Sequence, residues 1–303
     1  MSAQDKLKLN TIESAINDIR LGKVIIVVDD QNRENEGDFV AAAEAITPEI
    51  INFMATHGRG LICAPITGKL SKKLKLNLMV GSSSDPQDTA FTVSVDFKGN
   101  GVSTGISAAD RSKTIKALID PKTKPHQFSK PGHVFPLISK EGGVLVRAGH
   151  TEASVDVSKL SKCGTSAVIC EIMNDDGTMA RRDDLFKFSK EHKLKIATIS
   201  DLISYRRKKE KIIERTLKTK IKSQYGGQFD LIVYKNKVVP AEHIALVKGK
   251  INLKKPVLVR VHALNFLTDI LGTSLFVDNQ IKKSMRMISK KKNGDIVIIK
   301  EPK

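Results

Sequence analysis

The sequence contains no tryptophan, and its aromatic residues are few. Aromatic side chains make up 5% of the 303 residues, so leucine, isoleucine and valine must supply most of the hydrophobic core. No stretch approaches the roughly 20 consecutive apolar residues that cross a membrane. No apolar segment follows the first charged residues, so neither a transmembrane helix nor a secretory signal peptide is predicted.

Cysteine is also scarce. Cys63, Cys163 and Cys170 stand singly and form no CxxC pair. Isolated cysteines in a chain without a signal peptide are typical of reduced thiols, so a cytoplasmic location is expected. No cysteine follows Cys170, which excludes a thiolate zinc site from the rest of the chain.

Acidic residues are rare in the last third of the chain. From Tyr205 to Lys303 there are 24 Lys and Arg residues against 8 Asp and Glu residues, and this part carries +16 of the net charge of +18. The change predicts a first domain over residues 1–205 and a smaller, basic domain over residues 206–303. Such a charge can attract nucleic acid, but no aromatic stacking platform accompanies it, so a solvated lysine-rich surface is favoured.

Apolar periodicity predicts helices that alternate with strands. An amphipathic helix is expected over residues 11–20, with Thr11 as its N-cap. Further helices are predicted at 48–54, 114–119 and 183–192, and strands at 24–28, 39–45, 60–66, 91–96, 144–146, 167–173 and 197–199. In the basic part, strands are expected at 228–234, 254–262 and 296–299, with a helix or turn at 264–271. This order predicts a layered α/β or α+β domain followed by a smaller α/β domain.

The first predicted strand leads into a crowded polar segment. Five carboxylates and Arg33 lie between Asp29 and Asp38. Like charges at one strand end repel one another unless a positive group sits between them, and hard divalent cations prefer oxygen ligands. An isolated acidic turn is more often simply solvated, so a metal site requires a second polar cluster.

Four other polar clusters supply candidates for such a site. They are Ser103–Ser107 with Asp110 and Arg111 after it, Lys130–Pro136 around His133, Arg147–Glu152 around His150, and Glu171 within an apolar strand. Arginine, histidine and threonine together offer phosphate contacts and a metal ligand. A carboxylate in an apolar strand is costly unless it is paired or functional, which suits a general acid or base.

Five segments resemble the 3,4-dihydroxy-2-butanone 4-phosphate synthase family. They are DDQNRENEGDF, STGISAADR, KPGHVFPL, RAGHTEASVD and CEIMNDDGTMAR, in the family's order and spacing. The match covers residues 8–206. The resemblance implies a mixed sheet surrounded by helices, and a riboflavin-pathway lyase that converts D-ribulose 5-phosphate into L-3,4-dihydroxy-2-butanone 4-phosphate and formate.

The resemblance also implies residue roles. The metal ligands would be Glu34 and His150, holding Mg²⁺ or Mn²⁺, with two ions expected per site. The catalytic groups would be His133, Glu171, Glu36 and Asp38. The substrate-binding positions would be Arg33, Glu34, Asp38, Cys63, Thr104, Arg147, Ala148, Gly149, His150, Thr151 and Glu171, with Thr104, Arg147 and Thr151 facing the phosphate. The family is dimeric with shared sites, so His133 or His150 is expected to act across a subunit interface.

The basic part resembles the start of a GTP cyclohydrolase II domain over residues 218–249 and 257–262. The positions of that family's three zinc cysteines are held by Asn265, Phe276 and Asp278, and the sequence stops at Lys303, before its later GTP-binding segments. We therefore expect this part to bind no zinc, to be inactive, and to serve stability, assembly or regulation, with His262 in a structural role.

Three alternatives to a single-activity lyase remain. A bifunctional synthase and cyclohydrolase is disfavoured because the zinc cysteines are missing. The basic part could act as a nucleic-acid-binding or regulatory module beside the same lyase activity. A non-catalytic scaffold is disfavoured by the intact set of polar clusters in the first 200 residues or so.

Overall fold

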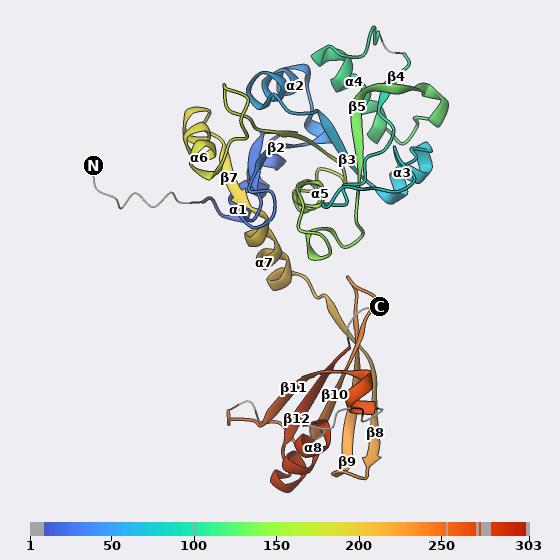
Figure 1. The fold of residues 1–303 in the computed structure, drawn as a ribbon, viewed down its shortest axis with the longest axis vertical. Helices are drawn as coiled ribbons and strands as arrows, with labels where there is room; N and C mark the ends of the chain where they lie inside the picture. The colour runs from blue at the N-terminus through green and yellow to red at the C-terminus, as the bar shows by residue number, and fades with distance from the viewer. Residues whose placement is uncertain (1–8, 100, 253, 271–272, 274–279, 301–303) are drawn as a thin grey trace, which may run out of the picture. The chain divides into compact units, whose positions relative to one another are not determined.

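The computed structural model describes residues 9–99, 101–252, 254–270, 273 and 280–300. The chain divides into two compact units, Met1–Lys209 and Glu210–Lys303 (Figure 1). Helix α7 (Ile199–Lys209) completes the first unit, and the predicted boundary at residues 205/206 lies within this helix. Among the described residues, no helix is long and apolar enough to cross a membrane.

The first unit is built on a seven-stranded mixed sheet with the order β4-β5-β3-β6-β2-β1-β7. Its strands are β1 (Ile25–Val28), β2 (Gly37–Ala42), β3 (Cys63–Thr67), β4 (Val95–Phe97), β5 (Phe128–Ser139), β6 (Ala167–Glu171) and β7 (Lys195–Thr198). The pairs β1–β7 and β3–β5 are parallel and the others are antiparallel. The predicted layered fold with a mixed sheet is confirmed.

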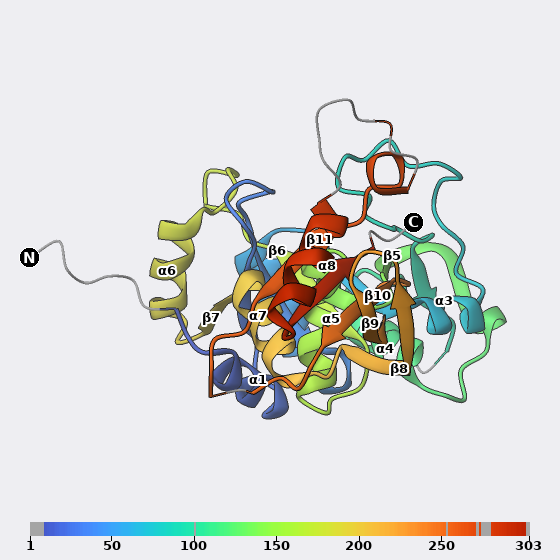
Figure 2. The same cartoon turned by 90° about the horizontal axis from the view of Figure 1, so that it is seen from below.

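Helices cover both faces of this sheet (Figures 1 and 2). The helices before α7 are α1 (Ile12–Arg20), α2 (Pro48–Phe53), α3 (Gly68–Leu74), α4 (Ala108–Ile119), α5 (His150–Leu160) and α6 (Arg182–Glu191). α1, α5 and α7 pack over one face, whose buried residues include Val40 and Ile169. The opposite face, which includes Phe39 and Cys170, is covered by α2, α4 and α6. The predicted cap at Thr11 is present, because its side chain accepts from the Ser14 amide, and Thr47 caps α2 by accepting from the Ile50 amide.

The strand predicted at residues 144–146 is wrong. Residues Gly143–Leu145 form a short 3₁₀ turn. The buried carboxylate of Asp156 in α5 accepts the Val144 amide at 2.8 Å and pairs with Arg206 at 2.6 Å. Gly143 has a φ of +64°, and a side chain there would meet the Asp156 carboxylate. The buried Asp156 carboxylate therefore stabilises a tight turn at Gly143–Leu145 in place of a strand. Residues Arg147–Glu152 follow this turn directly.

The second unit contains a five-stranded sheet with the order β11-β12-β10-β9-β8. Its strands are β8 (Ile213–Ser223), β9 (Gly227–Asn236), β10 (Glu242–Lys248), β11 (Val259–Ala263) and β12 (Gly294–Ile299). Helix α8 (Gln280–Lys291) packs Met285 and Ile288 against Phe229, Leu246 and Ile296. The strand predicted at 254–262 is shorter and later than expected, and the segment predicted as a helix or turn contains a π-helical turn at Phe266–Ile270.

Candidate active site

The sheet register brings two of the predicted residues together. Asp38 in β2 lies directly opposite Glu171 in β6, and Cys63 in β3 lies opposite Ile169, two residues earlier in β6. Directly paired residues, and residues two apart, share a face of a sheet. Asp38, Glu171 and Cys63 therefore lie on one face, the face that α5 covers.

The acidic segment after β1 is folded around Asp29. Its carboxylate accepts the backbone amides of Glu36 at 2.9 Å and Glu34 at 3.1 Å, and it pairs with Arg33 at 2.9 Å. From outside, the Arg181 guanidinium donates to the carbonyl oxygens of Glu34 and Asn35, each at 2.7 Å. The segment is therefore held by an inner carboxylate and an outer arginine, which fixes the direction of the Glu34 side chain.

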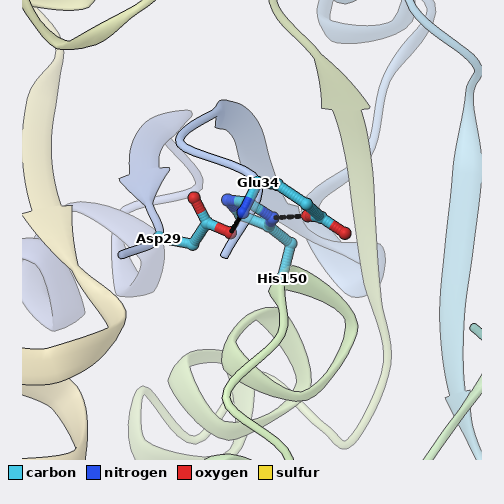
Figure 3. Close-up of side chains that lie close together, drawn as sticks. All are labelled: Asp29, Glu34 and His150. Atoms are coloured by element: carbon cyan, nitrogen blue, oxygen red, sulfur yellow. Dashed lines mark hydrogen bonds and ion pairs between the residues drawn. The ribbon is translucent and has the colours of Figure 1, made fainter. Parts of the chain in front are cut away.

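His150 is the first residue of α5 and reaches this acidic segment. Its Nδ1 lies 3.6 Å from a carboxylate oxygen of Glu34 and 4.0 Å from one of Asp38. Figure 3 shows Asp29, Glu34 and His150 converging from the end of β1, the following loop and the first turn of α5. Their ligand atoms all lie within 4.8 Å of one another, a grouping that could hold a metal ion.

Burial and charge perturb the acid–base properties of this group. Burial, together with the neighbouring carboxylates, raises the pKa of Asp38 to about 7 despite the opposing effect of His150. Burial lowers the pKa of His150, but Asp38, Glu34 and Asp29 outweigh it and raise the pKa to about 9. The nearby His150 imidazole is the largest cause of the lowered pKa of Glu34, whereas burial raises the pKa of Glu36. The carboxylates around His150 thus favour a positive charge among them, which either an imidazolium or a bound cation could supply.

The donor set fits a hard divalent cation. His150 Nε2 and Asp38 Oδ1 are buried and have no hydrogen-bond partner, although buried polar atoms are normally paired. Carboxylate oxygens with one imidazole nitrogen suit Mg²⁺ or Mn²⁺. Glu34 and His150 are the ligands that the resemblance implies, and Asp29 is the third member of the group, with both of its oxygens accepting the hydrogen bonds that fold the loop.

Arg147 lies next to this group but is heavily engaged. Its Nη1 pairs with Glu152 at 2.7 Å, and its Nε and Nη2 donate to the Gln87 carbonyl. Its Nη2 also donates to the Thr89 hydroxyl. Gly149 precedes α5, and a Cβ there would come within 2.2 Å of Arg147 Nη1. The segment from Arg147 through Ala148 to the buried Thr151 is thus packed tightly around the guanidinium.

His133 and Thr104 belong to a separate group at the β4–β5 edge. His133 Nδ1 lies 2.7 Å from Asp96 Oδ2, and its side chain is 41% exposed. The exposed Thr104 precedes Gly105, where a Cβ would come within 2.1 Å of Asp96 Oδ2. Asp96 therefore contacts His133 directly, and the Gly105 backbone next to Thr104 packs against the same carboxylate.

Cys63 lines the site as an unreactive thiol. Its side chain is buried, and burial raises its pKa well above the usual value. Because the thiolate is the reactive form, a raised pKa disfavours a nucleophilic role for this thiol beside Asp38 and Glu171.

Sequence reasoning assigned no role to several residues that organise the site. They are Asp29, Asp96, Glu152 and Arg181. Asp96 and Arg181 have partners far along the chain, so no local spacing marks them. Asp29 and Glu152 pair with Arg33 and Arg147, four and five residues away, and this local spacing was a usable signal.

We predict that Gly60→Ala inactivates the protein. A Cβ at residue 60 would lie 2.4 Å from Glu171 Oε2 and 2.8 Å from the Glu171 amide nitrogen, so this carboxylate must move. Glu171 Oε2 would then lose the Leu61 amide, which it accepts at 2.8 Å. Catalytic assay together with circular dichroism checks this. Gly68→Ala is the control, because a Cβ there would meet only Ile138 Cγ2, at an ordinary contact distance of 3.8 Å. Equal activity of the two variants would contradict the prediction.

Comparison with known proteins agrees with this geometry. A family model described as 3,4-dihydroxy-2-butanone 4-phosphate synthase matches residues 13–205, and one described as GTP cyclohydrolase II matches residues 214–303. The riboflavin biosynthesis protein RibBA of Cytophaga hutchinsonii is 48% identical over 298 residues, which cover 98% of this chain and 73% of that protein. RibBA of Aquifex aeolicus is 49% identical over 302 residues, covering 99% and 74%.

Solved structures give the same result. RibBX of A. baumannii, described as a two-domain 3,4-dihydroxy-2-butanone 4-phosphate synthase, superposes with a TM-score of 0.80 at 40% identity, over 96% of this chain and 81% of that one. A synthase described in complex with two magnesium ions superposes with a TM-score of 0.64 at 40% identity, over 66% and 98%. The resemblance seen in the sequence is thereby confirmed, and a divalent cation is consistent with it. The chain belongs to the 3,4-dihydroxy-2-butanone 4-phosphate synthase family, carries a GTP cyclohydrolase II-family segment behind that domain, and is an enzyme of riboflavin biosynthesis.

Proposed function

We propose that the site converts D-ribulose 5-phosphate into L-3,4-dihydroxy-2-butanone 4-phosphate and formate. The observation that carries this proposal is the meeting of Glu34 and His150. A carboxylate and an imidazole from segments more than a hundred positions apart lie 3.6 Å from one another, beside the buried Asp38. Burying several acidic groups together costs free energy, and a cation-binding site for a metal-dependent enolisation explains why they lie together.

The proposed cofactor is Mg²⁺ or Mn²⁺, with two ions per site. Glu34 and His150 would hold it, and the substrate's hydroxyl and carbonyl oxygens would complete its ligands. When bound, the ion polarises the carbonyl group and stabilises negative charge on the substrate oxygens. The family member described with two magnesium ions supports this count.

Proton transfer is assigned to His133 and to the carboxylates on the sheet. Asp38 has a pKa raised to about 7, so it can both accept and return a proton near neutrality. Glu171 lies opposite Asp38, with one carboxylate oxygen held by the Leu61 amide. Two acids fixed on adjacent strands can serve different carbons of one substrate, as an enolisation followed by loss of water requires. Glu36, whose pKa is raised by burial, is the third candidate.

The phosphate is proposed to bind at the start of α5. The eleven-residue helix presents its N-terminal amides beside Thr151, and an anion is stabilised at a helix N-terminus. Arg147 would contribute its charge from a fixed position, since Glu152 and Gln87 hold its guanidinium. Arg33 would face the substrate from the opposite side, where it now pairs with Asp29 and Glu34.

The functional enzyme is proposed to be a homodimer with sites shared between subunits. β5 is separated from β6 by β3, so at roughly 4.8 Å per strand His133 lies about 10 Å across the sheet from the strand of Glu171. Large apolar side chains around both groups are each 46–56% exposed: Leu61, Leu78, Met79, Val80, Ile106 and Val146. A second copy that covers them would bring its own His133 and Thr104 to the metal group.

The second unit is proposed to lack zinc-dependent cyclohydrolase activity. Of the three positions that match zinc cysteines, Phe276 and Asp278 lie outside the described residues. The side-chain oxygen of Asn265 accepts the backbone amides of Leu267 and Thr268, as in a helix cap. His262 Nε2 pairs with Asp269 at 2.8 Å, in keeping with a structural role. An amide engaged in capping is a poor substitute for a thiolate ligand.

We predict that Glu34→Gln abolishes metal-dependent turnover. Losing a ligand that supports about 4 kcal/mol of charge stabilisation lowers kcat by about 10³-fold. Formate release and Mn²⁺ affinity, measured by electron paramagnetic resonance, should fall together. Glu49→Gln, an exposed change at the start of α2, is the control. Unchanged Mn²⁺ affinity in Glu34→Gln would refute the metal assignment.

We predict that two inactive variants restore activity when co-expressed. In a mixed dimer of His133→Asn and His150→Asn chains, one of the two sites receives both intact imidazoles. With random pairing, about one quarter of the normal activity should return. Mixing His150→Asn with Glu34→Gln is the matched control, because both residues belong to one subunit's metal group. If the first mixture stays as inactive as the control, sites are not shared in this way.

We predict that the protein does not open the ring of GTP. Purified protein with GTP and Zn²⁺ should release no pyrophosphate above a protein-free sample, while the same preparation forms formate from ribulose 5-phosphate. Pyrophosphate formation dependent on the protein would show that the second unit is active without thiolate ligands.

A further inference from the structure

Asp96 grips His133 at two points. Its Oδ2 lies 2.7 Å from the ring Nδ1, and its Oδ1 accepts the His133 backbone amide at 2.9 Å. The Asp96 side chain is only 12% exposed, whereas that of His133 is 41% exposed. One carboxylate thus contacts both the main chain and the imidazole of the same residue, while the His133 side chain stays partly exposed.

Local chain geometry creates this grip. Val95 pairs with Val134, but Asp96 pairs with Ser129, so the β5 segment between Ser129 and Val134 leaves the ladder. The His133 amide then needs another acceptor, because a backbone donor is costly to leave unpaired. Asp96 supplies it, and Ser94 Oγ does the same for the Gly132 amide at 3.1 Å.

Two glycines allow the close approach. A Cβ at Gly132 would come within 2.1 Å of the Val95 carbonyl carbon. Gly105, with a φ of +93°, would place a Cβ 2.1 Å from Asp96 Oδ2. The backbone before Gly105 is itself tied to Asp110, which accepts from the Ser103 amide and hydroxyl. The backbone at Gly105 therefore packs closely against the Asp96 carboxylate, which restricts the rotation of that side chain.

We infer that Asp96 is a positioning residue that holds His133 in the Nδ1–H tautomer and leaves Nε2 as the proton-transfer atom. A carboxylate oxygen at 2.7 Å from Nδ1 accepts a hydrogen bond, so the ring proton lies on Nδ1 and the Nε2 lone pair is free. A partner that fixes the tautomer and aim of an imidazole increases its effectiveness in acid–base catalysis. This inference rests on the proposed catalytic role of His133.

Asp96→Asn separates positioning from structural support. The asparagine carbonyl can still accept the His133 amide, which places its NH₂ group against Nδ1. The amide donates there, so Nδ1 becomes an acceptor and the ring proton moves to Nε2. We expect kcat to fall about 10- to 100-fold with little change in KM, less than the loss of about 10²–10⁴-fold expected for His133→Asn.

The tautomer itself is the deciding readout. Nitrogen-15 NMR of histidine-labelled protein, with the His133 signals assigned by their loss in His133→Asn, should show a protonated Nδ1 in the unmodified protein and a protonated Nε2 in Asp96→Asn. Ser94→Ala is the matched control, since it removes the neighbouring support of the same segment without touching the ring. It should leave the tautomer unchanged.

The possible outcomes separate the catalytic role of His133 from the positioning role of Asp96. If His133→Asn retains turnover, the role proposed for His133 fails, and the inference on Asp96 fails with it. If His133→Asn is inactive but Asp96→Asn keeps full kcat, only the positioning role fails. A protonated Nε2 in the unmodified protein would also overturn it, and that measurement holds even if the variant does not fold.

Discussion

The acidic side chains at the ends of β1 and β2 can share one site because His150 lies among them. Two like charges 4 Å apart repel by about 4 kcal/mol at an effective dielectric constant of 20. Burial makes the charged state of Asp38 still less favourable. The imidazole at the start of α5 relieves this repulsion, and a cation would do so more completely. The Asp29 loop, the Gly149 cap and the packing of α5 all serve to bring these groups together.

The two halves of the site obey different physical rules. The group around Glu34 and His150 is an excess of buried acid that calls for a cation. The group around His133 is already balanced, because a single carboxylate satisfies the backbone and ring of the same residue. The group around Glu34 and His150 is thus suited to binding a cation, and the group around His133 to keeping the imidazole in one orientation. A division of this kind suits a reaction that must hold a charged sugar phosphate while protons move at several of its carbons.

Much of this could be predicted from the sequence, and the exceptions have physical causes. Buried strands such as β1 and β6 carry β-branched runs that mark them directly, and the caps at Thr11 and Thr47 follow local rules. The run at 144–146 looked like a strand, but Asp156 from a later helix captured its amide. Glu34 and His150 were predicted from a family resemblance, and the structure places them 3.6 Å apart. Asp96 was not predicted, because its partner lies 37 positions away and follows no spacing rule.

The direct pairing of Asp38 with Glu171 has a consequence for how this protein can vary. Successive side chains in a strand alternate between faces, so inserting or deleting one residue in β2 or β6 would swing one of these acids onto the opposite helical layer. The number of residues within these two strands is therefore set by the site, whereas loops that carry none of its residues tolerate insertions more readily.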